Sequence, residues 1–250
     1  MREPTERFSD RVENYAKYRP NYPHSVLQFF HTLIRPPGTV ADIGSGTGIL
    51  TLQLLNSGYE VYAVEPNEAM RREADWSLGV HSAFHSVRGT AESTTLADRS
   101  IDLITCAQAF HWFDRIKTKL EFRRILKVEG LAALVWNERL EDASVVNREY
   151  EKLLRSLAPD YQNVSHRQVG LEEIRAFFDP GEVELRTFRN DQILDRERFL
   201  GRLLSSSYVP NLGQPGYREI VDAAAEVFDA LSIGGKITFD CETKVYVGRF

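Results

Sequence analysis

Three glycines in alternate positions, Gly44, Gly46 and Gly48, directly follow a largely apolar stretch at 39–43 and constrain this chain more than any other feature. Glycine has no Cβ, so its backbone can approach a ligand closely and turn amides toward polar ligand atoms. The residues after the loop are rich in leucine and stop at Gly58, a common residue at the end of a helix. A strand, a glycine loop and a helix in this order predict a nucleotide-type ligand site.

A second apolar stretch, 59–64, ends at Glu65, and Pro66 then opens another helical pattern. In a strand-helix-strand unit, an acid at this point lies beside the glycine loop. It can accept hydrogen bonds from both hydroxyls of a ribose. The structural alternative is an acid placed at the start of a helix, where the helix dipole favours it.

The details of the loop indicate which nucleotide it suits. A dinucleotide fingerprint would place its third glycine at position 49, where this chain has Ile49, and a phosphate-binding loop would need a Lys-Ser or Lys-Thr pair there. Asp42 would repel a phosphate but suits a ligand that carries an ammonium or sulfonium charge, and it can also tether loop amides. The residues therefore favour a cation-bearing nucleoside over a nicotinamide dinucleotide.

The segment from Val40 to Gly48 resembles motif I of the S-adenosylmethionine-dependent methyltransferases with the Rossmann-like fold (class I). Further landmarks follow in order. Residues 61–67 resemble the motif whose acid holds the ribose, 89–92 the loop that borders the adenine, and 101–107 the fourth strand. The resemblance covers about 38–137 and implies S-adenosylmethionine as cofactor, with no metal.

The resemblance also implies which residues hold the cofactor. The backbone of Ala91 and the side chain of Glu92 would recognise adenine, although Glu92 can also be a solvated surface acid. The carbonyls of Cys106 and Ala107 would hold the methionine ammonium group. The complete expected set is Asp42, Gly44, Ser45, Gly46, Gly48, Glu65, Pro66, Ala91, Glu92, Cys106 and Ala107.

The segments that flank these motifs, 8–23, 108–113 and 243–249, are similar to the small-molecule methyltransferases grouped with trans-aconitate methyltransferase. This similarity implies a small-molecule acceptor, with a carboxylate or hydroxyl oxygen as the favoured methylated atom. A carboxylate needs no base, whereas a phenol, thiol or amine must lose a proton, for which His111 is the candidate catalytic residue. The candidate acceptor contacts, each with packing as the alternative role, are Tyr15, Tyr18, Arg19, Tyr22, His111, Trp112 and Tyr208.

Composition narrows the functional classes. A net charge of −5 at pH 7 gives no general attraction to nucleic acids, so we expect none as partner. The two cysteines have no metal or redox spacing, and His81 and His85 fall in an expected strand rather than on one helix face, so no metal site is predicted. The charged N-terminus and the lack of an apolar stretch of about 18 residues predict a cytoplasmic protein without membrane attachment. The oligomeric state stays open between monomer and homodimer.

Alternating apolar runs and helical patterns predict an α/β fold, with strands at 39–43, 59–64, 82–87, 101–106 and 131–136. Apolar runs this continuous indicate a parallel sheet covered on both faces. Helices are expected at 10–18, 23–34, 116–127, 144–157, 170–178, 195–207 and 217–231, and further strands at 183–190 and within 236–249.

These elements are expected to form a Rossmann-like, mostly parallel sheet of seven strands in a single domain, 1–250. Its core would span about 36–137, while 138–250 would complete the sheet and supply a helical cap over the acceptor. Three functions stay open: a small-molecule methyltransferase, a nicotinamide oxidoreductase, and a non-catalytic module that binds the nucleoside.

Overall fold

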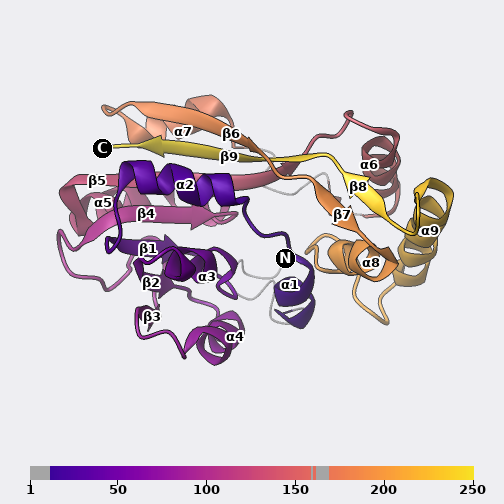
Figure 1. Cartoon of the computed structure of the whole chain (residues 1–250), viewed down its shortest axis with the longest axis horizontal. Coiled ribbons are helices and arrows are strands. Elements are labelled where there is room, and N and C mark those ends of the chain that lie inside the picture. Colours follow the sequence, from indigo (N-terminus) through magenta and orange to yellow (C-terminus); the bar gives the residue numbers. More distant parts are fainter. Residues whose placement is uncertain (1–11, 159, 162–168) are drawn as a thin grey trace.

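A computed structural model describes residues 12–158, 160–161 and 169–250, and its centre is a seven-stranded sheet (Figure 1). The strands lie in the order β3-β2-β1-β4-β5-β9-β6. Their bounds are β1 Thr39–Ile43, β2 Glu60–Val64, β3 Phe84–Val87, β4 Ile101–Ala107, β5 Leu126–Arg139, β6 Val183–Arg189 and β9 Cys241–Gly248.

The strands from β3 to β5 are parallel, whereas β9 runs antiparallel to both of its neighbours, β5 and β6. Parallel strands need crossover connections. The connections from β1 to β2, from β2 to β3 and from β4 to β5 are helices, whereas residues 88–100 join β3 to β4 without one. Because β1, β2 and β4 point the same way, their carboxyl ends meet at one edge of the sheet. The helices are α1 Val12–Tyr18, α2 His24–Leu33, α3 Ile49–Asn56, α4 Glu68–Leu78, α5 Arg115–Ile125, α6 Val145–Leu157, α7 Leu171–Phe178, α8 Arg196–Leu204 and α9 Tyr217–Leu231.

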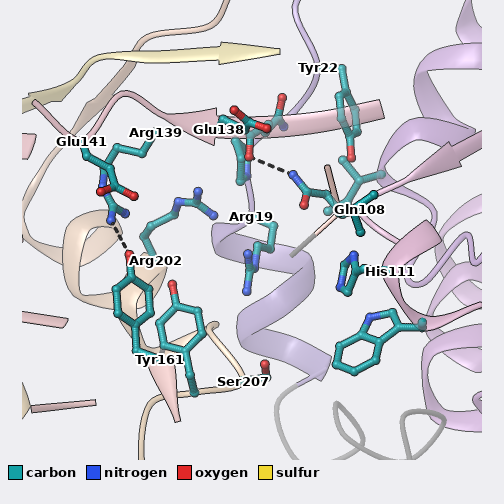
Figure 2. A pocket seen from close by; sticks show the side chains of 16 residues that line it. Arg19, Tyr22, Gln108, His111, Glu138, Arg139, Glu141, Tyr161, Arg202 and Ser207 are labelled. Atoms are coloured by element: carbon teal, nitrogen blue, oxygen red, sulfur yellow. Dashed lines mark hydrogen bonds between the residues drawn. The ribbon is translucent and has the colours of Figure 1, made fainter. Parts of the chain in front are cut away.

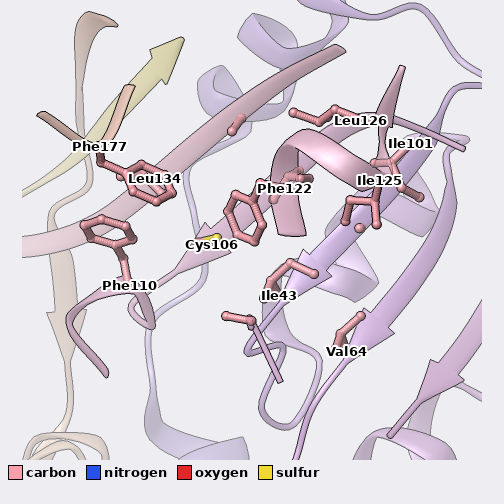
Figure 3. Packing of buried hydrophobic residues seen from close by; sticks show 14 of the residues in the cluster. Ile43, Val64, Ile101, Cys106, Phe110, Phe122, Ile125, Leu126, Leu134 and Phe177 are labelled. Carbon is pink, nitrogen blue, oxygen red and sulfur yellow. The ribbon is translucent and has the colours of Figure 1, made fainter. Parts of the chain in front are cut away.

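Alternate residues of each central strand enter two separate cores, as the pleat of a strand requires. On one face, Ile43 and Leu134 pack with Phe122 of α5 and Phe177 of α7 (Figure 3). On the other face, strand residues such as Val40 pack against α2, α3 and α4. The α/β fold with a mostly parallel sheet covered on both faces is therefore confirmed.

A third apolar cluster lies apart from the sheet, in a group that we call the second lobe: α6, α8, α9 and the short strands β7 Gln192–Leu194 and β8 Ile237–Phe239. These two strands pair with each other and not with the main sheet. Strand pairing between β5 and β9 continues to Arg139 and Cys241, so the two long strands lead from the sheet into the second lobe, on the right of Figure 1. In the described part of the chain, no helix is both long and apolar enough to cross a bilayer.

Most expected elements match, and the differences come from long-range pairing. Strand β5 begins at Leu126 rather than at 131, because Leu126 pairs with Ile101 before a shift in register. It also runs past 136, since β9 supplies a partner as far as Arg139. The helix expected at 195–207 ends at Leu204, β7 was not expected, and the first two residues of the helix expected at 10–18 lie outside the described residues. Local patterns carry no information on such distant partners.

Candidate functional site

The glycine loop joins β1 to α3 at the edge where the parallel strands end. All three of its glycines have a positive φ, at +71° for Gly44, +59° for Gly46 and +84° for Gly48. A Cβ on Gly44 would lie 2.6 Å from the Ala109 Cβ, and one on Gly48 would lie 2.5 Å from Leu78 Cδ1. Gly44 and Gly48 are thus needed for close packing, and Gly44 and Gly46 line a cavity.

Glu65 lies directly after β2 and connects its own turn to the glycine loop. Its Oε2 accepts a hydrogen bond from the Gly46 amide at 2.9 Å, and its Oε1 accepts one from the Asn67 amide at 2.8 Å. Burial raises the pKa of the Glu65 carboxyl, although these amides oppose the rise. The carboxylate is therefore held rigidly at the wall of the same cavity as Gly46.

Asp42 lies behind the loop, in the core. Its Oδ2 accepts a hydrogen bond from Thr51 at 2.7 Å and its Oδ1 accepts one from Thr105 at 2.9 Å, so it links α3 to β4. Burial raises the pKa of the Asp42 carboxyl to about 6, against the effect of these two hydroxyls. The Asp42 carboxyl thus binds its proton more tightly in the folded protein than in an unfolded chain, where the pKa of an aspartate is about 3.9. The neutral Asp42 carboxyl therefore stabilises the folded state. This stabilisation is complete below about pH 3.9 and is lost as the pH rises through about 6.

Asp42→Asn should remove this pH-dependent component. From about pH 4.5 to about pH 7.5, the free energy of unfolding of the wild type should fall by roughly 2 kcal/mol more than that of the variant. Urea unfolding of both proteins at the two pH values measures this difference. Parallel pH curves would show that Asp42 does not titrate in this range.

A smaller cavity of about 160 Å³ opens at the carboxyl edge of β1, β2 and β4. Of the residues expected to hold a cofactor, seven line it: Gly44, Gly46, Glu65, Pro66, Ala91, Glu92 and Ala107. Four do not, each for a packing reason. Asp42 and the Cys106 side chain are buried in the core, Gly48 packs on α4, and the Ser45 amide donates to the Val64 carbonyl at 3.2 Å. The role expected of Cys106 concerns its backbone carbonyl and stays a prediction.

Several residues of this wall do not belong to the set expected from the sequence. They are Asn67, Met70, Thr90, Gln108, Ala109 and Phe113, and Trp112 was expected only on the acceptor side. Asn67, Thr90 and Gln108 directly adjoin Pro66, Ala91 and Ala107, so nearness in sequence was an available signal for these three. Met70 and Phe113 lie further along the chain and had no such signal. The wall combines the Glu65 carboxylate with apolar and aromatic surfaces from Met70 and Phe113.

A larger cavity of about 480 Å³ adjoins the first and extends to the second lobe (Figure 2). Five of the expected acceptor contacts line it: Arg19, Tyr22, His111, Trp112 and Tyr208. Tyr18 does not, because its ring packs on Gly201 of α8, where a Cβ would lie 2.5 Å away, and its hydroxyl donates to Glu197 at 2.9 Å. The side chain of Tyr15 falls outside the described residues.

The remaining wall of the larger cavity comes from residues to which the sequence assigned no individual role. The added lining residues are Pro20, Ile49, Gln108, Asn137, Glu138, Arg139, Glu141, Tyr161, Val169, Arg202 and Ser207. The polar run from Asn137 to Arg139, directly after an apolar strand, was a usable signal, because parallel strands present ligand sites at their carboxyl ends. Arg202 lies within an ordinary helical pattern and carried no such signal.

Gln108 and Trp112 line both cavities. Gln108 directly follows β4, has a φ of +57°, and donates from its side-chain Nε2 to the Asn137 carbonyl at 2.9 Å. His111 and Trp112 form a short 3-10 turn with Phe110, and the two rings lie 4.7 Å apart. A ligand in the smaller cavity would therefore lie next to a ligand in the larger one, at the turn after β4.

In the part of the chain that the structure describes, no cluster of three or more His, Cys, Asp or Glu side chains is arranged to hold a metal ion. His85 instead stacks on Tyr62 with ring centroids 4.5 Å apart and contacts Glu60 at 2.9 Å.

Comparison with known proteins agrees with this geometry. Residues 41–134 match a family model described as a methyltransferase domain. An uncharacterized methyltransferase of Mycobacterium tuberculosis is 36% identical over 134 residues, which are 54% of this chain and 53% of that protein. One of Schizosaccharomyces pombe is 32% identical over 139 residues, 53% of each protein. The matched part of the chain thus spans about half the length of these curated relatives.

Solved structures share the fold over most of the chain. A protein of Anaeromyxobacter dehalogenans, provisionally described as a type II methyltransferase, has a TM-score of 0.67 at 24% identity and covers 92% of this chain and 97% of its own. The YcgJ protein of Bacillus subtilis has a TM-score of 0.59 at 23% identity, with coverage of 91% and 100%. Phosphoethanolamine N-methyltransferase 2 of Haemonchus contortus, solved with S-adenosylmethionine, has a TM-score of 0.58 at 17% identity, with coverage of 99% and 58%.

Proposed function

We propose that this protein transfers a methyl group from S-adenosylmethionine to a small-molecule acceptor. The proposal starts from residues 41–134, a methyltransferase domain of the class I, Rossmann-like type. The observation that carries the proposal is the shared wall of the two cavities at Gln108 and Trp112. A donor in the smaller cavity and an acceptor in the larger one would meet there. The acceptor cavity is closed in part by α8 and Tyr208, beyond the matched domain, so we propose that 138–250 acts with the core as one unit.

The residues of the smaller cavity fit the proposed cofactor. The buried Glu65 carboxylate can accept hydrogen bonds from ribose hydroxyls, and the apolar surfaces of Met70, Ala91 and Phe113 suit a purine base. A bound sulfonium supplies a methyl group that is reactive toward nucleophiles. The protein needs chiefly to align the two ligands and to exclude water.

His111 is the proposed proton acceptor when the methylated group must be deprotonated. Its ring lies at the wall of the larger cavity, next to Trp112 and on the same side as Gln108 (Figure 2). A carboxylate acceptor is already ionised at neutral pH and would use His111 only for orientation. We favour a carboxylate or hydroxyl oxygen as the methylated atom, in keeping with the resemblance to trans-aconitate methyltransferase.

Glu65→Ala should weaken binding of S-adenosylhomocysteine by about 1 to 3 kcal/mol, because charge-assisted hydrogen bonds to the ribose are lost. Titration calorimetry on both proteins measures the difference. Glu68→Ala is the matched control, since Glu68 is exposed on α4 and pairs only with Arg72 among the described residues. Unchanged affinity in Glu65→Ala would remove this residue from the ribose site.

An analogue of S-adenosylhomocysteine without ribose hydroxyls distinguishes a direct contact between Glu65 and the ribose from an indirect effect of Glu65 on the glycine loop. Glu65 also holds the Gly46 amide, so its loss could act through the loop. If the contact is direct, the analogue should bind the wild type and Glu65→Ala with equal affinity.

Transfer of labelled methyl groups to a panel of small acids, phenols and amines tests the reaction itself. Tight cofactor binding without transfer to any of them would favour a non-catalytic binding module.

A further inference from the structure

Arg202 stands out among the charged groups of the larger cavity. It lies on α8, its side chain is mostly enclosed, and its accessible part lines the cavity. Among residues 12–158, 160–161 and 169–250, its guanidinium has neither a hydrogen-bond acceptor nor a carboxylate partner. Partial removal of a guanidinium from water without a partner carries a desolvation cost, and its donors stay available to an anion in the cavity.

The carboxylates of the cavity wall, and its Arg139, already pair with charged side chains outside the cavity. Arg139 pairs with Glu151 at 2.7 Å, Glu138 with Lys244 at 2.6 Å, and Glu141 with Arg155 at 3.1 Å. These pairs use the carboxylates of the wall, so that in the described part of the chain none of them is left for Arg202.

The surroundings of Arg202 add positive rather than negative charge. Burial lowers the pKa of the Arg202 guanidinium, and the nearby charge of Arg19 lowers it further, with Tyr150, Tyr208 and Cys241 as the groups that oppose this. Arg19 reaches into the same cavity, and its Nη2 donates to the Ser205 carbonyl at 3.0 Å. Arginine stays protonated at any physiological pH, so the two positive charges persist together.

We propose that the acceptor carries an oxyanion, a carboxylate or a phosphate, that Arg202 binds together with Arg19 and that is distinct from the group to be methylated. This inference rests on the proposed function. A planar guanidinium binds two oxygens of one carboxylate or phosphate, and the bound anion would offset the cost of the buried charge.

The placement of Arg202 separates the anion from the reaction. In Figure 2, Arg202 lies across the cavity from Gln108 and His111, with Arg19 between them. The smaller cavity opens at the Gln108 side, so an anion on Arg202 is held away from the donor. The acceptor must therefore have at least two functional groups, an anionic one for recognition and a nucleophilic one that reaches the turn after β4.

The test compares the wild type with Arg202→Met, and with Arg198→Met as the matched control from an exposed position of the same helix. Each protein is saturated with S-adenosylhomocysteine and titrated with inorganic phosphate and with succinate, against sodium chloride at equal ionic strength. Calorimetry gives the dissociation constants and thermal unfolding gives the shift in Tm. One or both probes should bind the wild type and Arg198→Met alike, and should bind Arg202→Met at least about tenfold more weakly.

The two probes identify the anion, because binding of phosphate alone indicates a phosphoryl group and binding of succinate alone indicates a carboxylate. Without probe, Arg202→Met should have a Tm no lower than that of the wild type, because an uncompensated buried charge is removed. Equal probe affinity in Arg202→Met, or no effect of either probe on the wild type beyond that of sodium chloride, would overturn the inference. If the wild type does not bind S-adenosylhomocysteine, the proposed function is overturned instead. Failure of the inference and failure of the proposed function are therefore distinguishable.

Discussion

Gly46→Val should abolish measurable binding of S-adenosylhomocysteine, with a loss of at least about 100-fold in affinity. Gly46 lines the smaller cavity and has a φ of +59°. A valine side chain there would occupy space in a cavity of only about 160 Å³. It would also force a β-branched residue into the left-handed region, which shifts the Gly46 amide away from Glu65.

A variant of a second glycine separates the effect of backbone strain on stability from the effect of a blocked cavity on binding. Gly234 has a φ of +60°, and no heavy atom of the described residues lies within 4 Å of a Cβ placed there. Gly234→Val should therefore show a similar loss of stability, while its affinity for S-adenosylhomocysteine stays that of the wild type. Calorimetry and urea unfolding on both variants measure the two effects. If Gly46→Val still binds the ligand, the proposed close approach of the loop is refuted.

Glu151→Leu should lower the free energy of unfolding by about 3 to 5 kcal/mol, because it leaves the Arg139 guanidinium buried without its carboxylate. The two side chains are only 8% and 13% exposed, and their charged atoms lie 2.7 Å apart. The Tyr161 hydroxyl and the Arg155 Nε also donate to this carboxylate, so several donors lose their acceptor together. Urea unfolding of the variant measures the loss.

The control for this effect is an ion pair on the surface. Arg196 and Asp229 lie 3.3 Å apart with side chains 52% and 64% exposed, so Asp229→Ala should cost at most about 1 kcal/mol. The double variant Arg139→Met/Glu151→Leu should recover most of the stability, because no buried charge is left unpaired. A loss in Glu151→Leu no greater than that in Asp229→Ala would mean that the Arg139 charge is solvated.

The two halves of the site differ in how far the sequence could predict them. The smaller cavity is built from the ends of β1, β2 and β4 and the turns that follow them, so residues such as Gly46 and Glu65 could be assigned from the motifs. Asp42 could not be placed correctly, since only the tertiary fold shows that Thr51 and Thr105 occupy both of its oxygens. The alternation of strand side chains decides which motif residues face the cavity and which enter the core.

The larger cavity could be predicted only in part. Arg19 and His111 were expected from flanking motifs, but Arg202 and Tyr161 come from separate segments that carry no motif of their own. Tyr18 belonged to the same expected set as Arg19, yet it packs on Gly201, since neighbouring residues at the end of a helix point in different directions.

The α/β fold, the order of its main elements and the position of the glycine loop could be predicted from the sequence, because apolar periodicity and glycine spacing are local properties of a chain. The length of β5, the set of side chains that share a cavity and the pairing of charges became visible only in the folded chain. These features depend on contacts between distant segments, such as β5 with β9 and Arg139 with Glu151, and on the burial that such contacts produce. The free-energy cost of a charge depends on how far it is buried and on what surrounds it. The site around Arg202 could therefore be recognised only from the folded structure.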